Sequence, residues 1–536
     1  MKKLLMVLIL SATALANAQP FSQGQNNQAS LAASANKIAA LFQMIDVYYV
    51  DTVNGQKVTD DGIRAMLKDL DPHSVYIPAD ELKEMNEPLV GKFEGVGIQF
   101  NILDDTIMVT NTIPGGPSEK LGIMAGDRIV KIDTSNVASI KIKNSDVLKK
   151  LRGDKGTKVK VYIYRRSEPN LLEFLITRDK IPIFSIDASY MATPEIGYIK
   201  ISRFADSTVD EFKEKLKELK EKGMKSLILD LQGNGGGYLN RAIELADEFL
   251  SDRKLVVYTQ GRQQSRQDSY STSTGGWEKG KLAVLVDETS ASASEIVSGA
   301  IQDWDRGLII GRRSFGKGLV QKPYPLPDGS AVRLTIAHYY TPSGRCIQKP
   351  YDKGEDDYEE DISNRFKNGE LFSRDSIKFS DSLKVLTNAK RTVYGGGGIM
   401  PDVFVPLDTA MNSKYWQDLR RKGALNQWSL TYVDNNRKDL FAKYPDIETF
   451  KKNFVVDEDL IQKFIAYAEK QEVKYDTAGY KTSETLIKTF LKGLIAQDLW
   501  NVSAYFQITN DLNNTFKEAI KSINDKTFER NKIAVN

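Results

Sequence analysis

The distribution of hydrophobic and polar residues divides the chain into regions of different predicted structure. Residues 19–28 are rich in Gln, Asn and Ser, so we expect them to be disordered. Apolar residues recur at helical spacing over residues 31–49, and two further short helices are predicted over residues 59–70 and 79–87. From residue 409 onward the pattern is that of repeated amphipathic helices, which predicts a helical C-terminal domain.

The middle of the chain alternates short apolar strands with amphipathic helices. The order predicts a mixed α/β core with helices on its faces. Residues 351–390 are so rich in charge that we expect a solvated insertion in this core. Strands are predicted over residues 196–201, 226–231, 282–286, 308–310, 332–340 and 399–405, and helices over residues 210–222 and 238–249.

Composition limits the class of protein. At 536 residues the chain is too long for one ordinary core, so roughly three or four domains are expected. Charged residues make up 27% and apolar residues 41%, as in a globular protein, and the net charge of +3 comes without a long basic block. Nucleic acid is therefore not an expected partner. Cys346 is the only cysteine, which excludes an intrachain disulfide and favours packing as a small apolar residue.

The start of the chain has the pattern of a cleavable signal peptide over residues 1–18. Lys2 and Lys3 precede an apolar run over residues 4–14, and Ala16-Asn17-Ala18 offers a small-residue cleavage site. The apolar run is too short to cross a bilayer comfortably, and an uncleaved anchor is the alternative. We therefore expect an exported protein, periplasmic where the host has two membranes, with no lipid-accepting cysteine near the signal.

The strongest chemical signal is the pair Ser292 and Lys317. A serine hydroxyl is a weak nucleophile that needs a positioned base, and the chain has only two histidines, His73 and His338. A lysine can replace histidine where burial disfavours its charged form and lowers its pKa. Ser292 also precedes a predicted helix over residues 294–304, whose free N–H groups would stabilise an oxyanion.

The same residues are also compatible with plainer roles. Small residues before a helix are commonly caps, and Gly-Lys-Gly is commonly a turn. Residues 311–317 nearly fit the phosphate-binding pattern G-x-x-x-x-G-K-[ST], but Gly318 stands where a hydroxyl is needed, and three prolines follow. A Ser–His enzyme that uses His338 is a further alternative. The companion motifs of β-lactamase-type enzymes are missing.

Two glycine clusters offer backbone N–H groups to a ligand. KFEGVGI (residues 92–98) precedes a predicted strand edge, an arrangement that can hold a C-terminal carboxylate while a peptide adds as a strand. QGNGGG (residues 232–237) follows a buried strand, so its N–H groups can point into a site. His73 lies in the sequence LDPHS (residues 70–74), for which a structural turn is favoured over a catalytic role.

The sequence SASASEI, followed by GRRSFGKGLVQ, resembles the core signature of the carboxy-terminal processing peptidases, a Ser–Lys serine protease family. The resemblance covers residues 40–408 and implies a mixed α/β core of the ClpP/crotonase-like type. It also implies that Ser292 is the nucleophile, that Lys317 is the base and that Gln321 orients the lysine. The LDPHS turn is closely similar to one in the family.

The same resemblance implies an oxyanion hole. Its donors would be the N–H groups of Ala293 and of Gly236, with Gly237 as the alternative glycine. The matching loop of the family usually reads Asn-Pro-Gly-Gly, and Gly235 stands here in place of the proline. This departure predicts a more mobile loop.

Residues 91–180 resemble a PDZ domain. The likeness extends from the glycine-containing loop through PGGPSEKLGI to AGDRIVKI, with residues 147–151 as the helix beside the peptide groove. It implies that a substrate C-terminus is bound by Gly95, Val96, Gly97 and Ile98. Arg152 is the candidate residue that senses occupancy of this domain. The alternative is a PDZ fold that serves only as a spacer.

These observations predict an exported serine endopeptidase that recognises protein or peptide substrates by their free C-termini and cleaves envelope or exported proteins. A non-catalytic PDZ scaffold on a protease-like fold is the alternative. No cofactor or metal is expected; an adaptor protein and a second copy of the chain are further candidate partners. The predicted parts are a signal peptide (1–18), an N-terminal helical region (19–90), a PDZ domain (91–180), a protease core (181–408) and a helical C-terminal domain (409–536).

Overall fold

The computed structural model of the protein describes residues 22–166 and 168–533, with the backbone alone for residues 22–29. The predicted signal peptide lies outside the described residues. The chain divides into two compact units, residues 1–70 and residues 71–536.

The described part of the first unit consists of α1 (Ser22–Tyr48) and α2 (Gly55–Lys68). The prediction of disorder over residues 19–28 is wrong from Ser22 onward, where α1 has already begun. Gln and Ser carry only small helix penalties and Gly24 is the one strong exception, so the helix of the apolar stretch extends through this segment. Neither α1 nor any other described helix combines the length and the apolar character that crossing a bilayer requires.

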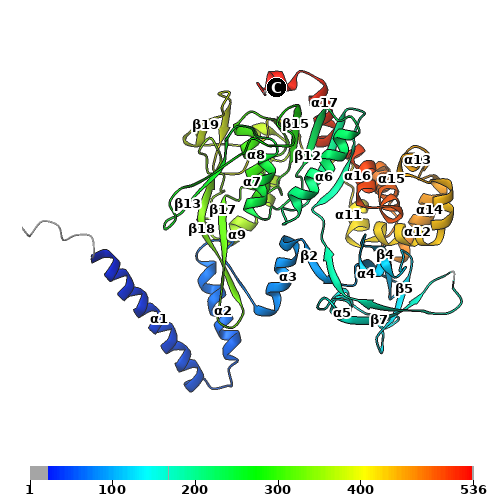
Figure 1. Ribbon diagram of the computed structural model, residues 1–536, viewed down its shortest axis with the longest axis horizontal. Coiled ribbons are helices and arrows are strands. Elements are labelled where there is room, and N and C mark those ends of the chain that lie inside the picture. The colour runs from blue at the N-terminus through cyan, green and yellow to red at the C-terminus, as the bar shows by residue number, and fades with distance from the viewer. Residues whose placement is uncertain (1–21, 167, 534–536) are drawn as a thin grey trace, which may run out of the picture. The chain divides into compact units, whose positions relative to one another are not determined.

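The second unit is built on a six-stranded sheet (Figure 1). All neighbouring strands run parallel except the first pair, which is antiparallel. The predicted closing strand over residues 399–405 is wrong in length, because only two of its residues join the sheet. In spatial order the strands are β10 (Ile186–Met191), β11 (Ile196–Ile201), β12 (Ser226–Asp230), β15 (Lys281–Val286), β16 (Leu308–Gly311) and β21 (Val403–Phe404).

Side chains alternate between the two faces of this sheet and are buried on both, as the continuous apolar runs predict. In β12, Leu227 and Leu229 pack on one face, whereas Ile228 packs on the other with residues of α17 (Asn514–Asn524). The first face is covered by α6 (Thr208–Glu221), α7 (Leu239–Asp247) and α8 (Ala293–Asp303). The mixed α/β core is therefore confirmed, and the C-terminal region supplies one of its layers.

A second, antiparallel sheet carries the segment after Lys317. Its centre is a long hairpin of β17 (Leu319–Pro325) and β18 (Ala331–Tyr340). The other strands are β1 (Val75–Ile77), which pairs with β18, β13 (Leu255–Gln260), which also pairs with β18, and β14 (Gln267–Tyr270), which pairs with β13. α3 (Ala79–Val90) follows β1.

The PDZ region forms its own sheet around a separate apolar core. The chain enters and leaves it through the paired strands β2 (Lys92–Gly95) and β9 (Asp179–Pro182). The sheet consists of β3 (Ile98–Leu103), β4 (Thr106–Thr112), β5 (Arg128–Ile132), β7 (Lys158–Tyr164) and β8 (Leu172–Thr177), with β6 (Ser135–Asn136) beside β5 and the helices α4 (Pro117–Lys120) and α5 (Asn144–Leu151).

The charged segment over residues 351–390 contains α9 (Glu355–Glu359), α10 (Asp361–Lys367) and the hairpin β19 (Lys384–Leu386)–β20 (Thr392–Tyr394). The prediction of a solvated insertion is wrong for part of it. Tyr358 is 4% and Arg365 is 2% exposed. A charged side chain tolerates such burial when it is paired, and Arg365 forms an ion pair with Asp361 and donates to backbone carbonyl groups.

The remaining C-terminal helices gather around an apolar core of their own (Figure 1). One of them also contacts the PDZ sheet. Asp434 of α12 pairs with Arg128 at 2.7 Å and Arg166 at 2.9 Å, and Leu430 packs against the β3–β4 hairpin. These helices are α11 (Lys414–Arg421), α12 (Ala424–Lys443), α13 (Ile447–Asn453), α14 (Glu458–Lys470), α15 (Thr477–Leu499) and α16 (Val502–Thr509). The short α18 (Thr527–Arg530) instead packs its Phe528 with α17 in the core of the six-stranded sheet.

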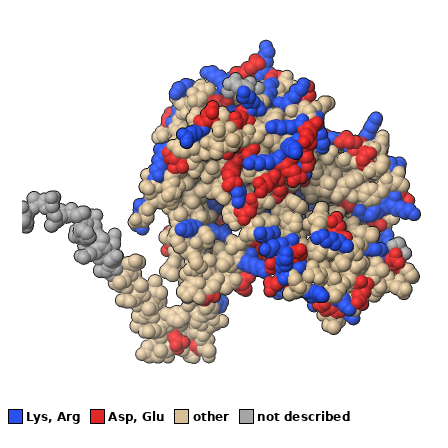
Figure 2. Space-filling model, in the orientation of Figure 1, with Lys and Arg blue, Asp and Glu red and all other residues tan. Residues whose placement is uncertain are grey.

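Charged side chains of both signs are interspersed on the face drawn in Figure 2. A mixed group lies over α6, whose sequence alternates acidic and basic residues. The basic side chains of this group are interrupted by acidic ones, so they form no continuous basic surface over α6.

Candidate active site

Ser292 lies at the turn between β15 and the start of α8. Its backbone φ is +54°, a left-handed conformation that is costly for a residue with a side chain. The side chain is partly exposed. Ala293 is the first residue of α8, so its N–H has no acceptor within that helix. This end of the helix therefore offers a hydroxyl and a backbone donor side by side.

Glu295 joins the backbone at Ser292 to the loop that carries Lys317. Its buried carboxylate accepts hydrogen bonds through Oε2 from the N–H of Ser292 (2.9 Å) and of Lys317 (2.8 Å). Through Oε1 it accepts from the N–H of Gly316 (2.7 Å) and the hydroxyl of Ser314 (2.5 Å). Burial raises the pKa of Glu295 to about 7, and the donors act in the opposite direction. One side chain thus sets the spacing between the two halves of the site.

We name residues 313–321 the lysine loop. Lys317 Nζ donates to Oε1 of Gln321 at 3.2 Å. Burial lowers the pKa of Lys317, and the positive charge of Arg333 acts in the same direction. The neutral amine is therefore populated at lower pH than that of a lysine in water.

Two further buried side chains hold the lysine loop by its carbonyl groups. The hydroxyl of Tyr339, on β18, donates to the carbonyl oxygen of Lys317 at 2.5 Å. Arg365, on α10, donates to the carbonyl oxygens of Ser314 (2.8 Å) and Phe315 (3.0 Å). Charge-assisted hydrogen bonds of this kind are stronger than neutral ones, so the charged insertion helps to fix the loop.

We name residues 232–237 the glycine loop, and it lies against Ser292. A Cβ atom on Gly236 would lie 2.7 Å from Cβ of Ser292, so only glycine fits here. The N–H of Gly236 donates to Oδ1 of Asn234 at 2.8 Å. Asn234 is fully buried, and its Nδ2 donates to the carbonyl oxygen of Ile201 at 2.9 Å. The predicted oxyanion donor is therefore engaged within its own loop.

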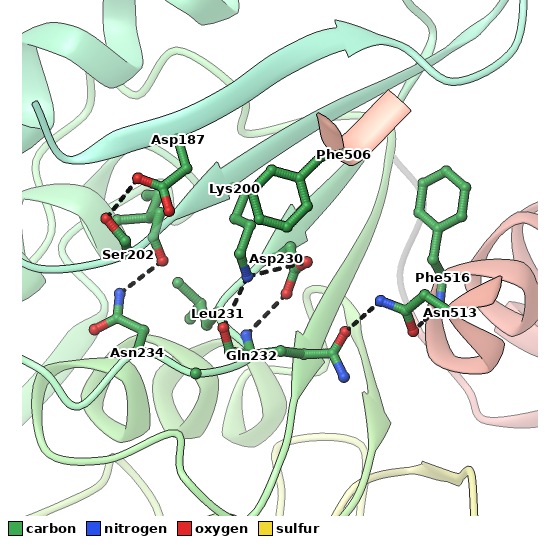
Figure 3. A network of polar contacts seen from close by, with 12 residues as sticks. Asp187, Lys200, Ser202, Asp230, Leu231, Gln232, Asn234, Phe506, Asn513 and Phe516 are labelled. Carbon is green, nitrogen blue, oxygen red and sulfur yellow. Dashed lines mark hydrogen bonds and ion pairs between the residues drawn. The ribbon is translucent and has the colours of Figure 1, made fainter. Parts of the chain in front are cut away.

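A polar network ties the start of the glycine loop to the sheet and to the C-terminal region (Figure 3). Lys200, on β11, donates to the carbonyl oxygen of Gln232 (2.8 Å) and pairs with Asp230 (3.4 Å). The side-chain oxygen of Gln232 accepts from Nδ2 of Asn513 at 2.9 Å. Asn513 caps α17, and Phe506 places its ring 5.3 Å from the Lys200 amine. The C-terminal region therefore reaches the glycine loop directly.

Comparisons with known families match most of the chain. Residues 195–359 match Peptidase family S41, and residues 95–176 match the PDZ domain. Residues 5–81 match the Activating protease CtpB N-terminal domain. Residues 415–501 match a Family of unknown function (DUF8443).

A carboxy-terminal-processing protease of Bartonella bacilliformis is 35% identical over 346 residues, which are 64% of this chain and 78% of the relative. The carboxy-terminal processing protease CtpB of Bacillus subtilis is 33% identical over 356 residues, 66% of this chain and 72% of the relative. The chain belongs to the carboxy-terminal processing proteases. It is therefore a serine-type peptidase. A solved structure of a photosystem II D1 C-terminal processing protease is 30% identical to this chain. The matched region covers 57% of this chain and 87% of the solved chain, with a TM-score of 0.33.

The PDZ domain of this processing protease has an open strand edge next to its glycine-containing loop. Within the described chain, β3 pairs only with β4 and stands at the end of the sheet. The carbonyl oxygen of Val96 accepts from the hydroxyl (2.6 Å) and N–H (3.2 Å) of Ser118, and that of Gly97 accepts from the N–H of Ile113 (3.0 Å). Gly97 has a φ of +77°, which favours glycine. The loop carbonyls are thus tied back while the edge of β3 stays available to an added strand.

Arg152 lies at the mouth of this loop, with its Cα 3.7 Å from the position of a Cβ on Gly95. Its guanidinium donates to Oε2 of Glu87, on α3, at 2.7 Å, and lies over the ring of Phe93. These contacts join the PDZ domain to α3. A role as a sensor that reaches the catalytic residues stays a prediction.

The two histidines have other partners. His338 Nδ1 lies 3.9 Å from Sγ of Cys346. His73 Nε2 lies 2.8 Å from the hydroxyl of Tyr358, and burial, with a smaller contribution from Lys317, lowers the pKa of His73 to about 4. Among the described residues, no three His, Cys, Asp or Glu side chains are grouped so that they could hold a metal ion.

Sequence reasoning missed several residues that hold this site together. Glu295 carried a usable signal, since Ser-x-x-Glu at a helix start is the pattern of a capping box. Asn234 lay within a recognised loop, but its side-chain contacts depend on the fold. Tyr339 and Arg365 had no local signal, because each meets the lysine loop through tertiary packing alone.

Proposed function

We propose that this processing protease is an exported endopeptidase with a Ser292–Lys317 dyad, and that its PDZ domain captures the C-termini of substrate proteins. The observation that carries the proposal is the buried amine of Lys317, held by Gln321 on a loop that Glu295 ties to the backbone of Ser292. A lysine with a lowered pKa suits a general base, and a serine at a strand-to-helix turn suits a nucleophile.

The reaction begins when neutral Lys317 takes the hydroxyl proton of Ser292 as its oxygen attacks the scissile carbonyl carbon. The tetrahedral intermediate collapses as the C–N bond breaks, and the leaving amine receives the proton from Lys317. Water then attacks the acyl-enzyme and gives a proton to Lys317. The second intermediate releases the carboxyl product, and the proton returns to Ser292.

The oxyanion of both intermediates would be held by the N–H of Ala293 and by the glycine loop. Gly236 can donate to it only if its hydrogen bond to Asn234 is exchanged or shared. A neutral amide acceptor makes this exchange inexpensive, since a neutral hydrogen bond contributes about 0.5–1.5 kcal/mol net.

Substrate capture is proposed at the loop of residues 95–98 and the edge of β3. An extended peptide would pair with β3 while its terminal carboxylate accepts N–H groups of the loop. Arg152, at the mouth of the loop, is the candidate sensor of this event: a bound carboxylate would compete with Glu87 for its guanidinium.

Two matched substrates test the capture step. A peptide substrate with an apolar C-terminal tail should bind and be cleaved faster than its C-amidated twin, because amidation removes the charge and one acceptor oxygen. Loss of a charge-assisted hydrogen bond, about 1.5–3 kcal/mol, corresponds to about a tenfold to hundredfold weaker Kd. Equal cleavage of both substrates, with equal binding to the PDZ domain by calorimetry, would show that this domain does not read C-termini.

Casein cleavage by the full chain and by Ser292→Ala tests the chemistry. Loss of activity in the variant, with an unchanged thermal unfolding midpoint, is the expected result; equal activity would remove Ser292 as the nucleophile. Fractionation and N-terminal sequencing of the mature protein test export, with Gln19 as the expected first residue. Light scattering tests self-association, and capture of an envelope partner tests binding to an adaptor.

A further inference from the structure

The turn of residues 71–74 has no part in the proposed chemistry, yet it contacts the lysine loop. The amide of Gln321 uses both of its ends: Oε1 accepts from Nζ of Lys317 at 3.2 Å, and Nε2 donates to the carbonyl oxygen of His73. One end of an amide accepts and the other donates. Because the His73 carbonyl can only accept, it holds the NH₂ group and leaves the amide oxygen facing Lys317.

Asp71 fixes this carbonyl by organising the turn. Its Oδ1 accepts from the N–H of His73 (2.9 Å) and of Ser74 (3.0 Å), and its Oδ2 accepts from the hydroxyl of Ser74 (2.6 Å). Asp71 is 8% and Ser74 is 5% exposed. A buried carboxylate with several donors is a strong local anchor, so the backbone at His73 has little freedom.

The turn is also tied to the strand pair that carries Gln321. Thr335, on β18, donates its hydroxyl to Oδ1 of Asp71 (3.0 Å) and its N–H to Oγ of Ser74 (3.1 Å). Thr335 is the residue opposite Gln321 in the β17–β18 ladder, and the register shifts immediately before Gln321. Such a bulge redirects a side chain. Gln321 and Thr335, which lie opposite each other in the hairpin, therefore both contact the turn.

Tyr358 holds the turn from the other side. Its hydroxyl lies 2.8 Å from Nε2 of His73, and the two rings meet edge to face with centroids 5.2 Å apart. Tyr358 comes from α9 of the charged insertion. The insertion therefore supports the surroundings of the proposed base at two places, through Arg365 on the lysine loop and through Tyr358 on the turn.

We infer that residues 71–74, braced by Tyr358, are a positioning element for the reaction: the His73 carbonyl selects the orientation of the Gln321 amide, and the amide oxygen aligns the amine of Lys317. The inference rests on the proposed role of Lys317 as base. A neutral amine has two N–H bonds and one lone pair. Holding one N–H against Gln321 limits rotation about the Cε–Nζ bond and thus the directions in which the lone pair can point.

A double-mutant cycle in the full chain tests this inference. Gln321→Ala should lower kcat about 30-fold and Asp71→Ala about 10-fold, with KM nearly unchanged in both. Because both changes remove the same link, the double variant should be no slower than Gln321→Ala alone. The matched control is Asp446→Ala, which removes another aspartate that accepts a backbone N–H, at the start of α13, and should leave kcat unchanged.

Additive losses, near 300-fold in the double variant, would overturn the inference, since they would show that Asp71 acts independently of Gln321. An unchanged kcat in Asp71→Ala would also overturn it. Where Asp71→Ala does not fold by thermal unfolding, Tyr358→Phe takes its place in the cycle, with an expected loss of about threefold. Retained activity in Lys317→Ala would refute the proposed base itself, whereas an inactive Lys317→Ala with additive losses would refute only the positioning role.

Discussion

The lysine loop and the glycine loop flank the same serine but are held in different ways. The lysine loop is held by hydrogen bonds to buried side chains from distant segments, among them the carboxylate of Glu295 and the guanidinium of Arg365. The glycine loop has charged partners only at its start, where Lys200 contacts Gln232 and Asp287 contacts Gly233. Around Gly236 it is held by the neutral amide of Asn234.

The difference follows from what each loop would have to do. A buried amine acts as a base only if its position and surroundings keep its pKa low, so the lysine loop needs strong, charge-assisted anchors. A loop that offers N–H groups to an oxyanion must release them from internal partners at the right moment. Neutral hydrogen bonds suit that purpose because they are weaker.

The largest expected effect comes from the lysine. Lys317→Ala and Lys317→Arg should each lower kcat about 10⁴-fold or more, as when other enzymes lose one member of a catalytic group. Arginine fails because its guanidinium does not release a proton near neutral pH. Initial rates on casein measure the effect, and thermal unfolding verifies the fold. Robust activity in Lys317→Ala would remove the lysine-base proposal.

Glu295→Gln should lower kcat about 100-fold. The carboxylate of Glu295 accepts from backbone N–H groups, whereas the NH₂ group of a glutamine would face some of those donors and could not accept from them. Each hydrogen bond lost in this way is worth about 1.5–3 kcal/mol. The melting temperature should fall as well. Glu484→Gln, which changes a half-exposed helix glutamate paired with Lys488, is the matched control and should be neutral. A Glu295→Gln enzyme with full kcat would show that the lysine loop does not depend on this anchor.

The pH dependence of kcat/KM is the next test of this comparison. The pKa of Lys317 is lowered, so its neutral form grows as pH rises, and kcat/KM should climb about tenfold per pH unit up to that pKa and then level off. Glu295, with a pKa raised to about 7, loses its proton around that pH and then accepts all of its donors. Glu295→Gln should remove any contribution of this titration to the profile, and His338→Gln should leave the profile unchanged. A profile that His338→Gln abolishes would identify a histidine base instead.

Smaller effects are expected in the glycine loop. Asn234→Ala removes neutral hydrogen bonds and should lower kcat about tenfold, whereas Asn513→Ala, one contact further away, should lower it about twofold to threefold. Steady-state rates on one peptide substrate measure both. A loss in Asn234→Ala as large as that in Glu295→Gln would mean that the two loops are held with equal strength.

The sequence by itself determined the order of elements and the residues able to take part in catalysis. Buried strands such as β12 and β15 were predicted within a residue, because continuous apolar runs between polar turns have few alternative structures. Ser292 and Lys317 were singled out by their residue types and spacing, and Gln321 by the resemblance to the carboxy-terminal processing peptidases. The family assignment followed from the same short motifs.

Only the tertiary structure decided which distant segments meet. α17 covers the second face of the core sheet. Arg365 and Tyr358 belong to the charged segment, and they contact the lysine loop and the turn of residues 71–74, respectively. Local periodicity reports whether a residue faces an apolar or a polar environment, not which partner it finds there. A buried arginine, a carbonyl that orients an amide and a carboxylate that joins a helix start to the lysine loop become visible only once the chain has brought their partners together.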